Sequence, residues 1–306
     1  MSVSFPYFSV IIPTRNEEKD ILKTLSAIAA NSFSDYEVLV VDASMDHTPD
    51  VIRGFNDPRF RLLAQNNRDG RCGARNQGIR MASGEVVIIL NADVMIPPDF
   101  LARLKKHYDE GADYVIVDST VENRQHPFGA MVEAEHRYLY HSNREIVNWC
   151  EGYSCRRQCA LEVGLFPEGF VVPICAGEDA VFSERIAKSF RRKEDLELVV
   201  KHSVPEDLTV FWSQRIGRGE GCSQRQLLLE KWSFAQMLFD GCCWSLKSFL
   251  WIFLFFPIVQ YSCKLAAQVP PIKFYQLIWP IFLSRTAHEI GRWKGFVRLR
   301  RFPLNQ

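Results

Sequence analysis

The stretch Phe8-Ser-Val-Ile-Ile-Pro-Thr-Arg-Asn-Glu-Glu18 places a cluster of polar residues directly after a run of apolar ones. Two later stretches repeat the pattern, namely Glu37-Val-Leu-Val-Val-Asp42 and Val86-Val-Ile-Ile-Leu-Asn-Ala-Asp93. Short apolar runs rich in Val and Ile are typical of strands covered on both faces. Ligands of an open α/β sheet bind at the carboxyl ends of its strands, so we expect the polar residues after these runs to line one crevice.

Predicted strands and helices alternate through the first 120 residues. The apolar runs predict strands over 7–13, 36–42, 60–65, 85–91 and 114–118. The segments of helical period between them predict helices over 17–31, 48–55, 74–82 and 97–110. Beyond residue 120 the pattern is less regular, up to a predicted helix over 179–190 and a strand over 196–200. This alternation indicates an α/β fold with a mainly parallel central sheet and flanking helices, followed by apolar helices near the C-terminus.

Composition excludes one class of partner. The 306 residues are 47% hydrophobic and 24% charged, which is enough to bury a full core. The net charge of +1 gives no general attraction to nucleic acid. The nine cysteines are scattered, and the N-terminus lacks the basic region and apolar stretch of a signal peptide. We therefore expect reduced thiols in a cytoplasmic setting.

The C-terminal region differs in character from the rest. Phe249–Cys263 is almost wholly apolar, but its roughly 15 residues fall short of the ~20 that a helix needs to cross a bilayer, and Pro257 interrupts it. A second run, Phe274–Leu283, is shorter and contains Pro280. From 285 to 301, six Lys or Arg residues face a single acid. These features favour helices lying in the interface of an anionic membrane, and the alternative is packing on the rest of the chain or on a second subunit.

The polar residues after the first two strands can hold a nucleoside. Pro13 ends the hydrogen-bond ladder of its strand, and Thr14, Arg15 and Glu17 follow at the expected mouth of the crevice. Asp42 ends the next strand, where a carboxylate can accept a hydrogen bond from the N–H of a base. Capping of the following helices by Thr14 or Asp42 is the competing interpretation.

The segment Asn66-Asn-Arg-Asp-Gly-Arg-Cys-Gly-Ala-Arg-Asn76 combines two glycines and three arginines ahead of a predicted helix, and it includes Asp69 and Arg75. Arginines and the backbone amides of a helix N-terminus suit a phosphate-rich ligand. A solvated loop is the alternative interpretation.

Asn91-Ala92-Asp93 directly follows an apolar strand. Residues i and i+2 of a strand point the same way, so Asn91 and Asp93 can reach one ligand, and an oxygen pair suits a hard divalent cation that bridges two phosphates. Asn91 supplies only a neutral oxygen, and a simple strand-end turn is equally compatible with the pattern. His202, just after the predicted strand over 196–200, is either a metal ligand or an ordinary histidine at a strand end.

Two further pairs of charged residues have both a chemical and a structural interpretation. Glu178-Asp179 opens a helix, where a carboxylate ordinarily stabilises the N-terminus but can also take a proton from an attacking hydroxyl. Arg215 and Arg218 are three residues apart on one helix face, where they can clamp a diphosphate or form a solvated basic surface.

Taken in order, these segments resemble the family 2 glycosyltransferases, which are inverting enzymes of the GT-A fold that use nucleotide-diphospho-sugars. The resemblance covers roughly residues 7 to 220 and includes Gly73-Ala-Arg-Asn76 and the segment from Gly152 to Phe166. It implies a metal-dependent, inverting hexosyltransferase with Asp179 as general base and Glu178 beside it. Asp93 and His202 are the implied ligands of Mg²⁺ or Mn²⁺. Contacts with the nucleotide-sugar are implied for Pro13, Thr14, Arg15, Glu17, Asp42, Asp69, Arg75, Asn91, Ala92, Arg215 and Arg218.

The resemblance also implies that three parts of the chain have different roles. Residues 1–120 would form the nucleotide-sugar-binding half of an α/β domain, 121–210 its acceptor-binding and catalytic half, and 211–306 a helical, membrane-associating region. The implied partners are a nucleotide-diphospho-sugar donor, a lipid-linked or surface glycan acceptor that enters through 123–170, and the cytoplasmic face of a membrane. No nucleic-acid partner is expected.

The chain departs from the family pattern at two positions. Asn91 stands where the family usually has the first Asp of Asp-x-Asp, and its neutral oxygen should weaken metal binding relative to a carboxylate. Gly219 stands where processive members have the Trp of Gln-x-x-Arg-Trp, which favours transfer of one sugar per encounter. Two alternatives to a glycosyltransferase remain: a catalytically silent scaffold that binds nucleotide-sugar at the membrane, and a nucleotidyltransferase of related fold.

Overall fold

The computed structural model describes residues 5–142 and 151–301. Its contacts divide the chain into two compact units, each described by itself. The sheet unit comprises Met1–Thr120, Ile146–Gly169 and Glu178–His202. The helical unit comprises Val121–Glu145, Phe170–Gly177 and Ser203–Gln306. Part of the segment predicted to admit the acceptor, 143–150, lies outside the described residues.

The first half of the sheet is parallel, as the alternating pattern predicts. β1 (Phe8–Thr14) pairs with β2 (Tyr36–Asp42) on one side and β4 (Val86–Ile89) on the other, and β2 pairs with β3 (Phe60–Ala64). Nearly every residue of β1, β2 and β4 is buried, because helices cover both faces. This burial is the physical reason for their unbroken apolar runs.

The other half of the sheet contains antiparallel pairs, which corrects the expectation of a mainly parallel sheet. β7 (Tyr153–Arg156) runs antiparallel to both β4 and β6 (Tyr114–Val121), and β5 (Val94–Met95) runs antiparallel to β8 (Arg192–His202). The strand order is β3-β2-β1-β4-β7-β6-β8-β5. The α/β fold class is confirmed, but an apolar run carries no information about strand direction, so the sequence could not show that the sheet is mixed.

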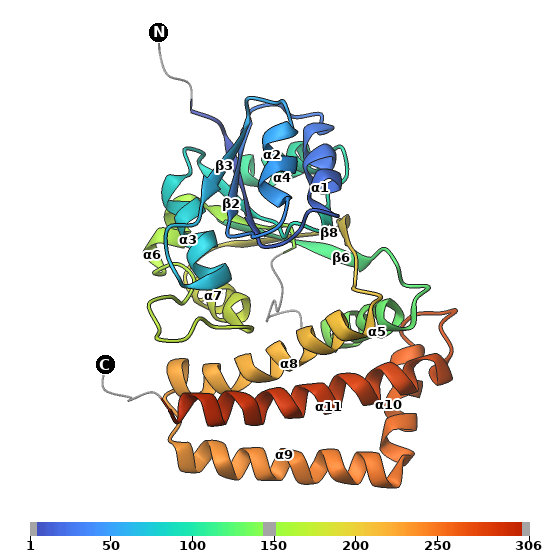
Figure 1. Ribbon diagram of the computed structural model, residues 1–306. Helices are drawn as coiled ribbons and strands as arrows, with labels where there is room; N and C mark the ends of the chain where they lie inside the picture. The colour runs from blue at the N-terminus through green and yellow to red at the C-terminus, as the bar shows by residue number, and fades with distance from the viewer. Residues whose placement is uncertain (1–4, 143–150, 302–306) are drawn as a thin grey trace. The chain divides into compact units, whose positions relative to one another are not determined.

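Helices connect and cover the strands of the sheet unit (Figure 1). They are α1 (Ile21–Ala29), α2 (Thr48–Gly54), α3 (Gly70–Met81), α4 (Phe100–Asp109), α6 (Arg157–Glu162) and α7 (Glu178–Ala187). The predicted helices over 17–31 and 97–110 are each shorter in the structure, because the chain enters both through polar or proline-containing turns. The first of these turns places polar residues at the carboxyl end of β1, whereas the second follows β5.

In the helical unit, α8, α11 and α9 lie side by side (Figure 1). The helices of this unit are α5 (Pro127–Ser142), α8 (Leu208–Gln224), α9 (Phe234–Leu254), α10 (Phe256–Ala266) and α11 (Phe274–Leu299), with a π-helical turn, η1 (Arg225–Leu229), after α8. A Cβ atom added to Gly219 would lie 2.0 Å from the carbonyl oxygen of His288, and one added to Gly291 would lie 2.0 Å from that of Ile216. The close packing of α8 on α11 therefore excludes a tryptophan at position 219.

The apolar segment Phe249–Cys263 is divided between α9 and α10. Phe255, with a φ of 54°, separates the two helices, and Pro257 lies in the first turn of α10. Within the described part of the chain no single helix has the length and apolar composition to span a membrane, whereas Phe234–Trp251 and Phe256–Ala266 meet that requirement together across a bend of 87°. The second run continues without a break inside α11 despite Pro280.

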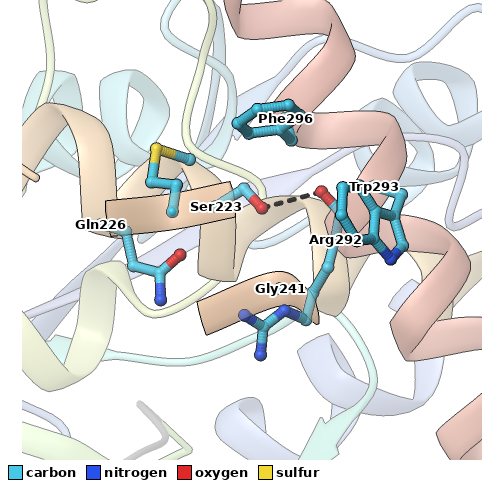
Figure 2. Close-up of a pocket in the computed structure, with 7 residues that line it drawn as sticks. Ser223, Gln226, Gly241, Arg292, Trp293 and Phe296 are labelled. Atoms are coloured by element: carbon cyan, nitrogen blue, oxygen red, sulfur yellow. Dashed lines mark hydrogen bonds between the residues drawn. The ribbon is translucent and has the colours of Figure 1, made fainter. Parts of the chain in front are cut away.

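A polar contact network ties α8, η1, α9 and α11 together inside the helical unit. Figure 2 shows Ser223 donating a hydrogen bond to the backbone carbonyl of Arg292, over 2.8 Å. The Arg292 guanidinium and the Gln226 amide both donate to Asp240 Oδ2. The space among these side chains is about 10 Å³, room for about one water molecule, so this is a packing gap and not a ligand pocket.

Candidate active site

The ends of β1 and β2 form one edge of the candidate site. Thr14 and Asp42 are paired in the parallel register, and Thr14 Oγ1 donates a hydrogen bond to Asp42 Oδ1 over 2.7 Å. Ser44 donates from its hydroxyl to the same oxygen and from its backbone N–H to Oδ2. These bonds fix the orientation of a buried carboxylate that retains lone pairs for a ligand. Pro13 lies within β1, and Arg15 is exposed just beyond it.

The loop after β1 brings Glu17 toward Asp93. The Glu17 backbone N–H donates to Thr48 Oγ1 over 2.8 Å, which anchors the loop to the start of α2. Burial raises the pKa of Glu17 to about 7, and the negative charge of Asp93 adds to this rise. The two carboxyl groups therefore lie close enough to repel one another, although they are 76 positions apart in the chain.

The turn Asn91–Ala92–Asp93 connects β4 to β5. Thr24 of α1 donates a hydrogen bond to the Ala92 carbonyl over 2.7 Å, which holds the turn against α1. β5 then pairs antiparallel with β8, so that Val94 lies opposite His202. Burial raises the pKa of Asp93 to about 6, the charge of His202 opposes this rise, and the charge of Glu151 adds to it. The structure thus brings Asp93 and His202, the two predicted metal ligands, together.

A buried ion pair links α3 to α7 behind this turn. Arg75 is 1% exposed, and its Nη1 donates to Glu178 Oε1 over 2.9 Å while its Nη2 donates to Asn91 Oδ1 over 3.2 Å. Arg71 lies 3.7 Å from the same Glu178 oxygen. Burial alone would raise the pKa of Glu178, but the two guanidinium groups outweigh it and hold that pKa below its usual range. Glu178 is therefore a fixed anion that neutralises Arg75.

Asp179 follows Glu178 in the first turn of α7. Its Oδ1 accepts a hydrogen bond from the Ala180 N–H over 3.0 Å. Burial raises the pKa of Asp179 to about 7, and the negative charges of Glu178 and Glu151 act in the same direction. A carboxylate with such a pKa can take up a proton near neutral pH. This property separates Asp179 from its neighbour Glu178, whose pKa is shifted the opposite way.

Glu151 is a site residue that the sequence analysis missed. The Asn91 amide donates to Glu151 Oε1 over 3.2 Å, and Oε2 is buried with no hydrogen-bond partner among the described residues. Its charge acts on both Asp93 and Asp179. In the sequence, Glu151 can be recognised only as a carboxylate just before the short strand β7. Because β7 is antiparallel to β4, the start of β7 lies at the carboxyl end of β4, and this geometry is visible only in the fold.

Three other predicted residues make contacts of a different kind or belong to the other unit. Asp69 precedes α3, and its Oδ1 accepts a hydrogen bond from the Gly169 N–H over 2.9 Å, which ties two loops of the sheet unit together. Arg215 and Arg218 belong to α8 of the helical unit, which is described by itself. Within the sheet unit, the charge of Glu151 acts on both Asp93 and Asp179, and Asp42 lies at the carboxyl end of β2.

The comparisons identify the family of this chain. Residues 9–161 match the family described as "Glycosyl transferase family 2", and the chain belongs to it. The family resemblance predicted from the sequence motifs is therefore confirmed.

Similar proteins support the same family and fold. Glycosyltransferase AglE of Haloferax volcanii is 36% identical over 108 residues, which are 34% of this chain and 36% of AglE. The Campylobacter jejuni GalNAc(5)-diNAcBac-PP-undecaprenol beta-1,3-glucosyltransferase is 33% identical over 121 residues, 38% of this chain and 39% of that enzyme. The match thus spans little more than a third of each relative. The mannosyltransferase PcManGT of Pyrobaculum calidifontis, solved with GDP-Man and Mn²⁺, has a TM-score of 0.58 at 21% identity, over 96% of this chain and 88% of that one.

Proposed function

We propose that this protein transfers a sugar from a nucleotide-diphospho-sugar to a hydroxyl group of a lipid-linked or surface glycan, with inversion at the anomeric carbon. The observation that supports the proposal most directly is that the adjacent residues Glu178 and Asp179 have pKa values shifted in opposite directions. Arg75 holds the first residue as an anion, and burial holds the second near the pKa that a general base needs. Family membership supplies the reaction class, and the C. jejuni relative, named for action on an undecaprenol-linked glycan, supports the acceptor class.

The reaction is a single displacement. Asp179 takes the proton of the acceptor hydroxyl, whose oxygen forms a bond to the anomeric carbon. The bond from that carbon to the diphosphate breaks on the opposite face, and its electron pair leaves with the nucleoside diphosphate. Inversion follows from this geometry. Thr14 and Asp42 would orient the nucleoside, and the turn at Asn91 and Ala92 would receive the diphosphate end of the donor.

A divalent cation, Mg²⁺ or Mn²⁺, is part of the proposal. The described residues contain no group of three or more His, Cys, Asp or Glu side chains arranged to hold a metal. Asp93 and His202 nevertheless provide one carboxylate and one imidazole at neighbouring strands, which fits a cation that takes its other ligands from phosphate oxygens and water. Bound there, the cation would neutralise charge on the departing diphosphate.

We also propose that the helical unit attaches the protein to the cytoplasmic face of a membrane. Phe239, Leu246, Phe249 and Leu250 of α9 are 74%, 60%, 58% and 44% exposed. Their spacing of three, four and seven residues puts them on one side of the helix. An exposed apolar stripe of this kind, with the basic residues of the C-terminal half of α11, suits an anionic lipid surface.

The test is transfer from a panel of UDP-, GDP- and dTDP-sugars to polyprenyl-diphosphate-linked glycans, with and without a chelator. We expect one donor class to support turnover, chelator to reduce it, and Asp179→Asn to reduce it strongly while leaving nucleotide binding intact. No turnover with any donor, together with unchanged nucleotide binding in Asp179→Asn, would favour the silent scaffold that Asn91 suggests.

A further inference from the structure

The helical unit contains a cavity of about 320 Å³ between α5, α8, α9 and α11. This volume is at the lower end of the range of small-molecule pockets, about 300–1,000 Å³. All of the residues that line the cavity belong to the helical unit, so its chemistry can be derived without reference to the sheet unit.

Three arginines line the cavity, Arg215 and Arg218 from α8 and Arg285 from α11. Arg215 is 4% exposed, and its Nε has no hydrogen-bond partner among the described residues. Its Nη1 lies 4.0 Å from Glu135 Oε2, which is beyond hydrogen-bonding distance. A buried guanidinium with no close anion among the described residues is costly in free energy, so this cavity wall suits a negatively charged group.

Mutual repulsion among the cavity cations supports this interpretation. Burial, and then the charge of Arg218, lower the pKa of Arg215 to about 9. Burial and the charges of four arginines lower the pKa of His288, another lining residue, to about 4. An anion inside the cavity would oppose the part of both shifts that comes from the neighbouring positive charges. The lining carboxylates of Glu135 and Glu289 number one fewer than the arginines, and Glu289 already accepts a hydrogen bond from Ser245.

The orientation of Arg285 is fixed by aromatic rings. Its guanidinium carbon lies 3.6 Å from the centroid of the Trp251 ring and 5.5 Å from that of Tyr261. A planar guanidinium held in this way presents its N–H groups as a rigid fork, the geometry that matches two phosphate oxygens. The cavity thus contains Arg285, whose N–H donors are held in a fixed orientation, and Arg215, whose buried charge has no close anion among the described residues.

We propose that this cavity binds the phosphate or diphosphate group of the lipid-linked acceptor, an assignment that rests on the acceptor class in the proposed function. Trp244 of α9 lines the cavity and is 40% exposed, and the same helix carries the exposed apolar stripe. A ligand with an anionic head and a hydrocarbon chain matches both features, whereas a nucleotide matches only the first. The sequence prediction that Arg215 and Arg218 clamp the donor diphosphate becomes the competing outcome.

Calorimetric binding to the full chain in detergent micelles tests the assignment. The probes are farnesyl diphosphate, farnesol, inorganic pyrophosphate and UDP. We expect farnesyl diphosphate to bind at least about tenfold more tightly than pyrophosphate, and farnesol not to bind measurably. Arg218→Gln and Arg285→Gln should each weaken farnesyl diphosphate binding by about tenfold or more, the scale of one charge-assisted hydrogen bond. Arg300→Gln, at an exposed arginine of the same unit outside the cavity, is the matched control.

Two results would overturn the proposal. If pyrophosphate and UDP bind as well as farnesyl diphosphate and are lost in the same variants, the cavity serves the donor diphosphate. If no variant changes binding, the cavity is not the site. Arg218 is exposed, so its substitution keeps the test valid even where Arg285→Gln fails to fold, as thermal unfolding would reveal. The measurement requires no turnover, so failure of sugar transfer would count against the proposed function and leave this result standing.

Discussion

Two almost fully buried arginines, one in each unit, have opposite environments. Arg75 of the sheet unit is 1% exposed and donates to Glu178 and Asn91 over 2.9 and 3.2 Å. Arg215 of the helical unit is 4% exposed, and its ion pair with Glu135 spans 4.0 Å. Among the described residues, the first charge has a carboxylate partner within hydrogen-bonding distance and the second has none.

The difference indicates what each region is built to meet. Arg75 is paired with Glu178 without a ligand, and burial together with the Glu178 charge raises the pKa of Asp179 before any substrate arrives. Around Arg215 no carboxylate of the described residues lies within hydrogen-bonding distance, which agrees with the anion-binding role proposed for the cavity. Preorganised charge suits a catalytic group, and unbalanced charge suits a binding site.

The largest expected effect tests whether the Arg75 network serves catalysis. Asp179→Asn removes the proton acceptor but preserves its shape, so kcat should fall by about 10²- to 10⁴-fold, the usual contribution of a general base. Donor affinity, measured by calorimetry with UDP-sugar, should remain. Asp35→Asn, at an exposed position of the same unit, should leave both unchanged. A kcat within a factor of two of the wild type would remove Asp179 from the mechanism.

Replacing each arginine by methionine sharpens the contrast in stability. Arg75→Met leaves the buried Glu178 charge without its closest partner and should cost about 3–5 kcal/mol of folding free energy. Arg215→Met removes a charge that is already poorly compensated, so its cost should be below about 1 kcal/mol, or its sign reversed. Denaturant unfolding measures both. Equal losses at the two positions would show that the two environments are alike after all.

The pH dependence of activity should follow Asp179. A general base must be unprotonated, so a pKa raised to about 7 means that activity is lost as pH falls below 7 and is full above it. The value of kcat/KM should decline about tenfold per pH unit on the acid side, as a single ionisation requires. The residual activity of Asp179→Asn should not show this decline on the acid side. A profile that is flat from pH 5 to 8 would contradict the assigned role.

The smallest effect concerns Asn91. Its amide accepts from Arg75 and donates to Glu151, so an aspartate there would keep the first contact but repel Glu151. Asn91→Asp should therefore lower the thermal stability of the metal-free protein and strengthen Mn²⁺ binding by about tenfold, the lower end of such effects around metal sites. Titration of Mn²⁺ by electron paramagnetic resonance in the presence of UDP measures the affinity. Weaker binding in the variant would argue against a cation at this turn.

The sequence predicted the first half of the fold well because the burial of a strand can be recognised from its apolar residues. Strands β1, β2 and β4 are covered on both faces, and such strands require continuous apolar runs. The apolar pattern does not show the direction of a strand, so the antiparallel pairing of β7 and β5 could not be predicted from the sequence. The break between α9 and α10 at Phe255 was likewise not readable, although Pro257 indicated that the apolar run is interrupted.

The candidate site also contains residues that the sequence could predict and one that it could not. Asp42, Asp93 and Asp179 follow or begin elements with recognisable patterns, so they could be named from the sequence. Glu151 could not, because its importance comes from an antiparallel neighbour and a hydrogen bond to Asn91. The roles of all four remain predictions for the experiments above.

The sequence alone determined which residues are buried in strands, the family to which the chain belongs and most of the polar residues that end the strands, since each depends on local pattern. Only the tertiary structure decided which charges are neutralised and which are not. Charge compensation depends on distances between residues far apart in the chain, such as Arg75 and Glu178, and no local pattern encodes those distances.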